Sequence, residues 1–196
     1  MILLRTLAIL LAGAGLACCS TKPDGAIELA ILHIQQEKLL CVPTSAAMIL
    51  AFYGDKQAPR KLKTLAAGHA YDPAKPFNDF SITMYRDIIT AVSSIGYTWE
   101  ERSLSNNESG FQQGLVFIAT ELGRRHPVMI DLSVPYGHTV VVYGIDQDQK
   151  TIKIIDPEQP SPGKIALTFN QLRDYWSEKA YGGSFRSLVL TSSKGL

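Results

Sequence analysis

The hydrophobic pattern divides the chain into a first half with helical periodicity and a second half of short strands. Residues 43–53 are nearly all apolar or small, with Pro43 close to the start and Gly54 directly after the end. These flanks predict a helix that begins at Cys41, and its lack of a polar face predicts burial on most sides. Apolar residues at three-to-four spacing predict further helices over residues 59–67, 82–95 and 110–123.

The chain after Arg125 is a series of short runs rich in β-branched residues, each bounded by turn residues. They predict strands over residues 127–132, 138–145, 151–155, 165–168 and 185–190, with a short helix over 170–176. The turn-forming segment 146–150 predicts a hairpin in which 138–145 lies antiparallel to 151–155. Helices followed by antiparallel strands indicate an α+β fold, and the lack of internal repeats indicates one domain, residues 31–196.

The first 19 residues have the pattern of a targeting segment. One basic residue, Arg5, precedes an apolar stretch over residues 6–16, which is shorter than the roughly 20 residues that a membrane-spanning helix needs. The run at 16–20 resembles the end of a bacterial lipoprotein signal, in which a cysteine is lipidated after cleavage. Cys19 is the preferred lipidation site because Leu16 lies three residues before it, and Cys18 is the alternative. Residues 20–30 would then connect the anchor to the domain.

This targeting segment predicts export, with the domain lipid-anchored to a bacterial membrane on its periplasmic or extracellular face. An ordinary cleaved signal peptide is the alternative, and it also predicts export. If processing removes or acylates Cys18 and Cys19, Cys41 is the only thiol left, so no internal disulfide can form. An exported free thiol is prone to oxidation and persists where its chemistry is used. Cys41 is therefore the first candidate for chemistry.

Charge and metal-binding motifs exclude several classes of function. The formal net charge is +1 and no basic run compensates for it, so nucleic acid is not an expected partner. The sequence has no His-Glu-x-x-His run and no Cys-x-x-Cys pair, so neither a metal site nor a cofactor is expected. The oligomeric state is not predicted by any of these features.

Cys41 lies where a helix start favours nucleophilic chemistry. The unpaired N–H groups and positive dipole end of a first helical turn favour thiolate over thiol. The backbone N–H of Cys41 can also donate to an oxyanion that develops during attack on a carbonyl. A second donor is usually needed, and Gln35 or Gln36 can supply it.

A thiolate nucleophile needs a base, and four histidines are available. His138 opens an apolar strand, where its side chain is rigidly held at the end of the sheet, and it is the best candidate. His69 and His126 occur at predicted helix ends, and His33 precedes the nucleophile; structural roles suffice for these three. Asp156 ends the strand that pairs with the strand of His138, so its carboxylate can orient the imidazole. Three other aspartates look like strand-edge or turn residues: Asp131, Asp146 and Asp148.

Several of these residues together resemble the papain-like peptidases that process bacteriocin leaders at double-glycine sites. Cys41 follows Gln35 by six residues, and the segment Pro43 to Gly54 ends in Ala-Phe-Tyr-Gly. Later in the chain the pairs Gly137-His138 and Asp156-Pro157 flank a Gly-x-Asp turn at 144–146, in the order of that family.

The resemblance covers roughly residues 31–176 and implies a papain-like fold, with a helical N-terminal half packed on a C-terminal antiparallel sheet. It also implies a cysteine peptidase that acts on a peptide or protein substrate. In this family pattern Gln35 completes the oxyanion hole, Cys41 is the nucleophile, His138 the base and Asp156 the orienting acid.

Two departures leave the substrate open. Val42 follows the nucleophile where the family usually has glycine, and the sequence has no P-loop of the exporter to which leader-cleaving members are fused. A transglutaminase-like or transpeptidase-like acyltransferase is a chemical alternative, although Thr139 stands where such enzymes tend to have an aromatic residue. A surface binding module without turnover is another alternative. Loops over 72–79 and 103–109 are expected to form the walls of a substrate groove.

Overall fold

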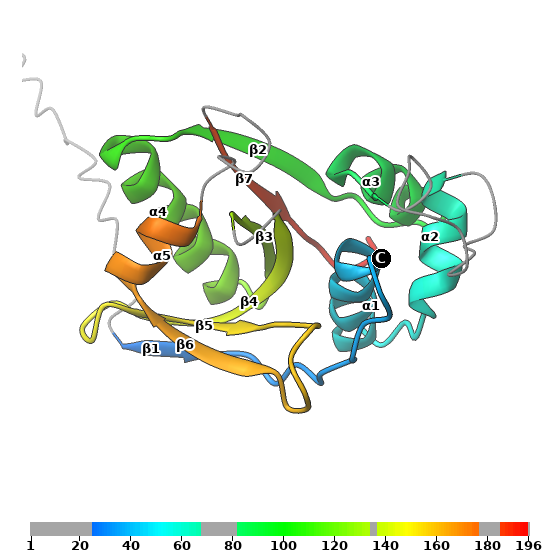
Figure 1. Ribbon diagram of the computed structural model, residues 1–196, viewed down its shortest axis with the longest axis horizontal. Helices are drawn as coiled ribbons and strands as arrows, with labels where there is room; N and C mark the ends of the chain where they lie inside the picture. The colour runs from blue at the N-terminus through cyan, green and yellow to red at the C-terminus, as the bar shows by residue number, and fades with distance from the viewer. Residues whose placement is uncertain (1–24, 68–81, 134–136, 177–184, 196) are drawn as a thin grey trace, which may run out of the picture.

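The computed structural model describes residues 25–67, 82–133, 137–176 and 185–195. The targeting segment, Cys18, Cys19, His69 and the 72–79 loop lie outside the described residues. The described part is built around a seven-stranded antiparallel sheet in the order β2-β7-β3-β4-β5-β6, with β1 also paired to β4 (Figure 1). No helix within it is long and apolar enough to cross a membrane.

The element bounds largely follow the predicted ones. The helices are α1 Cys41–Phe52, α2 Pro59–Ala67, α3 Tyr85–Ser93, α4 Glu108–Gly123 and α5 Phe169–Tyr175. The strands are β1 Ala26–Glu28, β2 Glu100–Ser105, β3 Val128–Leu132, β4 His138–Asp146, β5 Thr151–Ile155, β6 Lys164–Thr168 and β7 Phe185–Leu190. The α+β prediction and the β4–β5 hairpin are confirmed.

Strand β4 is the centre of the sheet. β5 pairs with β4 along one edge, while β3 pairs with its first half and β1 with its second half along the other edge. Ala26 is opposite Asp146 and Glu28 is opposite Gly144, so residues 26–28, which fall within the predicted connector over residues 20–30, form a strand of the sheet. The backbone of these three residues joins the sheet through pairing with a strand far away in the sequence.

Strand β2 corrects a second expectation. The segment 103–109, predicted as a loop in the groove wall, contains the end of β2 and the start of α4. β2 pairs along its whole length with β7, from Glu100 opposite Leu190 to Ser105 opposite Phe185. Asn107 then caps α4, because its side chain accepts a hydrogen bond from the backbone N–H of Gly110.

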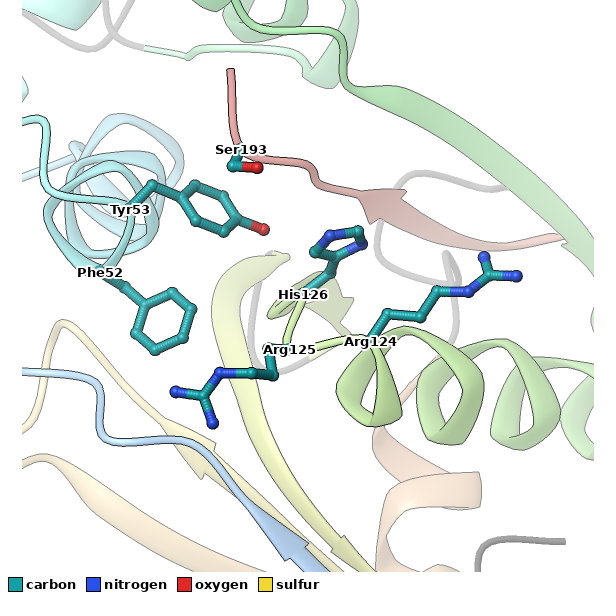
Figure 2. Close-up of a pocket in the computed structure, with 6 residues that line it drawn as sticks. All are labelled: Phe52, Tyr53, Arg124, Arg125, His126 and Ser193. Atoms are coloured by element: carbon teal, nitrogen blue, oxygen red, sulfur yellow. The ribbon is translucent and has the colours of Figure 1, made fainter. Parts of the chain in front are cut away.

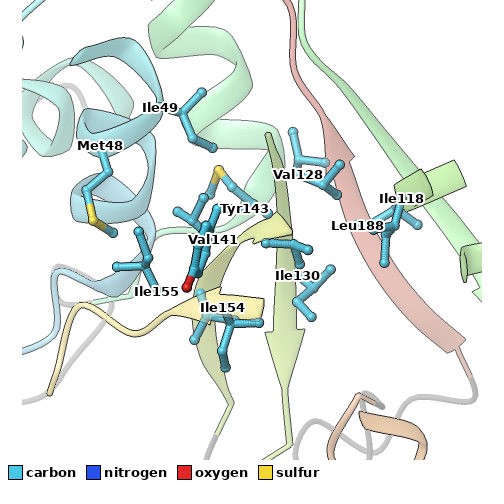
Figure 3. Close-up of a cluster of buried hydrophobic side chains, with 14 of the residues drawn as sticks. Met48, Ile49, Ile118, Val128, Ile130, Val141, Tyr143, Ile154, Ile155 and Leu188 are labelled. Atoms are coloured by element: carbon cyan, nitrogen blue, oxygen red, sulfur yellow. The ribbon is translucent and has the colours of Figure 1, made fainter. Parts of the chain in front are cut away.

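Helices cover both faces of the sheet, with α1 on one side and α4 and α5 on the other (Figure 1). Val141 and Ile155 are register partners, and both lie on the side of Met48 of α1, whereas Leu188 lies on the side of Ile118 of α4 (Figure 3). Because both faces are covered, residues 139–145 of β4 are all buried rather than alternating between core and solvent.

The helix that carries the nucleophile is buried over most of its length, as its apolar composition predicts. Residues 42–50 of α1 are all buried, and Ala46 and Leu50 have no exposed surface. Gly54 has a φ of 88° and follows the helix, and the N–H of Asp55 bonds back to Leu50 O. This left-handed glycine ends α1 and returns the chain toward α2.

Gly114 of α4 allows the close approach of a buried tryptophan, and this contact gives a stability prediction. A Cβ at Gly114 would lie 2.4 Å from Cη2 of Trp176, a side chain with no exposed surface. We expect Gly114→Ala to lower the free energy of unfolding by about 1–3 kcal/mol despite the better helix propensity of alanine. Gly123→Ala, at the exposed end of the same helix, should leave it unchanged or slightly raised. Urea unfolding of both variants checks the difference.

Candidate active site

Cys41 is the first residue of α1 and is partly exposed. Leu40 precedes the helix and no side chain caps the first turn, whose first bond runs from Thr44 N–H to Leu40 O. Pro43 has no N–H to donate. The N–H groups of Cys41 and Val42 therefore remain as the donors that this helix start can offer to an anion. The Val42 side chain itself points into the core and is buried.

A buried hydrogen bond fixes α1 against the strand of His138. The Ser45 hydroxyl donates to Thr139 O at 3.2 Å. Ser45 lies one turn after Cys41 on the same face of the helix, and Thr139 directly follows His138. This bond therefore helps to set Cys41 beside the imidazole of His138, whose pKa the Cys41 side chain helps to raise.

The sheet register explains why Asp156 meets His138. Val141 is opposite Ile155 in this antiparallel pair. Asp156 directly follows Ile155 and therefore comes opposite Val140. His138 lies two residues from Val140 on the same face, which makes it the diagonal neighbour of Asp156. His138 Nε2 lies 2.6 Å from Asp156 Oδ1, and both side chains are only 11% exposed. The carboxylate thus engages Nε2 and leaves Nδ1 as the ring nitrogen available to Cys41.

The electrostatics of this pair favour a charged imidazole. Burial alone would lower the pKa of His138, but hydrogen bonds to Asp156 and Cys41 outweigh burial and raise it to about 10. Burial alone would raise the pKa of Asp156, yet the bond to His138 outweighs this cost and lowers it. At neutral pH the site therefore holds an imidazolium between a carboxylate and the Cys41 sulfur.

The raised pKa of His138 predicts how stability depends on pH. Folded His138 keeps its proton up to about pH 10, whereas in the unfolded chain it loses the proton near 6.5. This group therefore contributes its full stability below 6.5 and loses it as pH rises through 10, by at most about 1.4 kcal/mol per pH unit. Between about pH 6 and pH 9, urea unfolding should show a steeper loss for the wild type than for His138→Gln. Parallel curves would contradict the raised pKa.

Asp156 is held by its neighbours in the β5–β6 loop as well as by His138. Its Oδ1 also accepts the N–H of Glu158 at 2.8 Å, and its own N–H donates to Gly163 O at 2.8 Å. From outside the loop, His33 Nε2 lies 3.1 Å from Asp156 O. His33 therefore contacts Asp156. The structural role predicted for His33 did not include this contact.

The two candidate glutamines differ in their surroundings. Gln35 is exposed, and its Nε2 donates to Glu158 O at 3.2 Å. Gln36 is partly buried, its N–H donates to Pro157 O at 2.8 Å, and its side-chain oxygen is buried without a partner in the described structure. The structure thus leaves the side-chain oxygen of Gln36 buried without a partner, whereas the Gln35 amide donates to Glu158 O.

One charged residue near the site was not anticipated from the sequence. Lys63 of α2 is 2% exposed and donates to Ile82 O and to the Thr83 hydroxyl, each at 2.9 Å. Burial lowers the pKa of Lys63, while the charges of Asp87 and Cys41 oppose that shift. Lys63 is the fifth residue of α2 and faces inward beside Leu62, which is fully buried.

An open cavity of the described structure lies away from Cys41, His138 and Asp156. It has a volume of about 300 Å³ and lies at the end of α1 opposite to Cys41, between Phe52, Tyr53, Arg124, Arg125, His126 and Ser193 (Figure 2). Arg124 and His126 are each bonded to Glu121 at 2.9 Å, so much of its positive charge is already compensated. His126 has the structural role that its position near a helix end indicated.

Comparisons with solved structures show a papain-like fold. The peptidase domain of Streptococcus ComA, a bifunctional ABC transporter of a quorum-sensing pathway, has a TM-score of 0.57 at 17% identity, covering 84% of this chain and 98% of that one. A double-glycine motif protease from an AMS/PCAT transporter, solved with its leader peptide, has a TM-score of 0.55 at 14% identity, covering 86% and 99%. Xylellain, a cysteine protease from Xylella fastidiosa, has a TM-score of 0.52 at 10% identity, covering 87% and 86%.

The family assignment comes from the sequence profile. No curated protein is a significant match to the chain. The profile of the Peptidase_C39 like family matches residues 28–183, which run from the last residue of β1 past α5 and include every candidate catalytic residue and both glutamines. Because this match covers most of the sequence, the chain belongs to the Peptidase_C39 like family.

Proposed function

We propose that this protein is a cysteine peptidase that hydrolyses peptide bonds through an acyl-enzyme on Cys41. The observation that carries the proposal is the imidazole of His138, which lies 2.6 Å from the Asp156 carboxylate and whose pKa is raised by both Asp156 and Cys41. A thiol, a base and an orienting acid in this order are the parts that nucleophilic acyl transfer requires.

The proposed reaction has two halves. The ionised sulfur of Cys41 attacks the carbonyl carbon, and the carbonyl electrons move onto oxygen as the S–C bond forms. His138 gives its proton to the leaving amine as the C–N bond breaks and the thioester forms. Water then attacks the thioester, His138 takes its proton, and the Cys41 sulfur leaves with the released electron pair. Asp156 holds the imidazole in the orientation that both proton transfers need.

For the second oxyanion donor we assign Gln36 in place of Gln35. The Gln35 amide is exposed and donates to Glu158 O, whereas the side-chain oxygen of Gln36 is buried without a partner in the described structure. Rotation about the last side-chain bond of Gln36 exchanges the oxygen and nitrogen ends and presents an N–H in the same place.

These two glutamines give a matched pair of variants. We expect Gln36→Ala to lower kcat by about 10²–10³, because the oxyanion loses a donor, while Gln35→Ala changes it less than about tenfold. Steady-state kinetics of both variants with one cleaved peptide is the measurement. If Gln35→Ala is the damaging change instead, the assignment returns to Gln35.

The proposed substrate class is a peptide or an extended protein segment. One structural relative was solved with a leader peptide bound, which supports an extended peptide as the kind of ligand that such a fold accepts. Digestion of a mixture of proteome-derived peptides, followed by mass spectrometry, should give new termini with the wild type and none with Cys41→Ala. If both proteins leave the mixture unchanged, the binding module without turnover becomes the leading alternative.

An acyltransferase would use the same thioester but pass the acyl group to an amine. Adding a simple amine to the digestion separates the two reactions. A hydrolase should yield mainly free carboxyl termini, whereas a transglutaminase-like or transpeptidase-like enzyme should yield mainly amides of the added amine.

We also propose that the domain is exported and anchored to a bacterial membrane through a lipid on Cys19, with Cys18 as the alternative. The support is the sequence pattern of the first 19 residues. Mass spectrometry of the mature N-terminus is the test. An acylated N-terminal cysteine agrees with the proposal, and an unmodified N-terminus contradicts it.

A further inference from the structure

The segment before the nucleophile helix, residues 29–40, is bonded at three successive points to the loop that carries Asp156. The N–H of Gln36 donates to Pro157 O, and Gln35 Nε2 donates to Glu158 O. His33 Nε2 lies 3.1 Å from Asp156 O, a partner 123 positions away in the sequence. The pre-helix segment and the β5–β6 loop thus form one connected unit on either side of the acid.

The bond from His33 acts directly on the main chain of Asp156. A carbonyl oxygen only accepts hydrogen bonds, so His33 must carry its proton on Nε2. On the other side, the N–H of Asp156 donates to Gly163 O at 2.8 Å. The backbone of Asp156 is therefore fixed in two directions, and its carboxylate extends from this fixed point toward His138 Nε2 at 2.6 Å.

The close contact between Gly163 and the His33 ring is a second observation on the position of His33. A Cβ at Gly163 would lie 2.4 Å from Cδ2 and 2.6 Å from Nε2 of the His33 ring, distances that side chains do not reach without a shift. Gly163 also has a φ of 61°, which a residue with a side chain adopts only at a cost. The loop can approach the His33 ring this closely only because residue 163 lacks a side chain.

We propose that His33 is a positioning residue for Asp156, holding the main chain of the acid so that its carboxylate stays on His138. This role rests on the proposed function, in which Asp156 orients the base. Gly163 is part of the same device, because it leaves room for the ring. A His33 that only ties two segments together would contribute to stability but would not affect the proton affinity of His138.

The test compares two side chains of similar size at position 33. His33→Gln keeps an N–H donor near the place of Nε2, whereas His33→Met fills similar space without a donor. Titration of the histidine rings by NMR, with His138→Ala used to assign the signal, follows the proton on His138. We expect His33→Met to lower the pKa of His138 by about one unit, a typical size for an environmental shift. His33→Gln should keep it near the wild-type value of about 10.

Gly163→Ala gives a second test that leaves His33 in the chain. Its Cβ would clash with the His33 ring and also with Asp156 O, 2.7 Å away, so we expect it to lower the pKa of His138 in the same direction as His33→Met. In the His33→Met background, Gly163→Ala should lower it by less than in the wild type, because the bond is already lost. If His33→Met does not fold, His33→Leu, which also lacks a donor, takes its place in both comparisons.

Two results would overturn the positioning role. One is a His138 titration in folded His33→Met and Gly163→Ala that coincides with the wild type. The other is an equal fall of the pKa in His33→Gln and His33→Met, which would show that the donor is irrelevant. Neither readout requires turnover. A protein that cleaves no peptide but in which His138 responds to His33 would refute the proposed function and leave the positioning role intact.

Discussion

Replacing His138 with alanine should lower kcat/KM by at least about a thousandfold. The imidazole is the only group in the described site that can take a proton from water and give one to the leaving amine, and both proposed half-reactions need this transfer. The same substitution removes the imidazolium that lies beside the attacking sulfur of Cys41. The measurement is the rate of peptide cleavage at saturating and at low substrate concentrations.

His126→Ala is a matched control for this experiment. His126 also forms a pair with a carboxylate, Glu121, at 2.9 Å and is partly buried, but it lies at the other end of α1. The His126→Ala variant should have a lower free energy of unfolding, and its kcat/KM should stay within a few-fold of the wild type. If His138→Ala also remained within tenfold of the wild type, His138 would not be the base.

Asp156→Ala and Asp156→Asn should differ in their effect on turnover. Alanine removes the acceptor of the His138 Nε2 proton, and we expect kcat/KM to fall by about 10²–10⁴. The amide oxygen of asparagine can accept the same proton and the Glu158 N–H, so Asp156→Asn should retain much more activity. Because Asp156→Asn loses the negative charge, the pKa of His138 should fall. The alkaline limb of the profile of kcat/KM against pH should then move to lower pH in this variant.

Kinetics of the two Asp156 variants across pH provide the measurement. Equal loss in both would mean that the charge of Asp156, and not the orientation of the imidazole, is what catalysis requires. Full activity in both, with an unchanged pH profile, would remove Asp156 from the mechanism.

The elements that sequence predicted well are those whose signal is local. The helix at Cys41 has an apolar run between Pro43 and Gly54, and the β4–β5 hairpin has turn residues between two apolar strands. β2 was missed because in its six residues only Leu104 is buried, so neither alternation nor an apolar run marks it. β1 is three residues long, and its pairing with β4 is a tertiary contact that the local sequence does not encode.

The site residues that could be predicted are likewise those marked by their own segment of the sequence. Cys41 at a helix start and His138 at a strand start could be selected from their own segments, and the hairpin then pointed to Asp156. His33 was assigned a structural role because its partner, Asp156 O, lies in a distant loop. The choice between Gln35 and Gln36 depends on which side chain turns inward in a segment without helix or strand periodicity.

The burial of Lys63 could not be predicted from the composition of its helix. Its helix begins Pro-Arg-Lys-Leu-Lys, which has the composition of a solvated basic surface. Burial of Lys63 is possible because Ile82 O and the Thr83 hydroxyl, from the segment before α3, accept its ammonium group. Only the packing of α2 against that segment reveals a cation near the nucleophile.

The rate at which iodoacetamide alkylates Cys41 near pH 6 tests the proposed nucleophile most directly. Peptide mapping by mass spectrometry separates Cys41 from Cys18 and Cys19, and glutathione serves as the reference thiol. With the imidazolium of His138 beside the sulfur, alkylation of Cys41 should be at least about tenfold faster than that of glutathione, and His138→Ala should remove the difference. A Cys41 that reacts no faster than glutathione in the folded wild-type protein would contradict the mechanism.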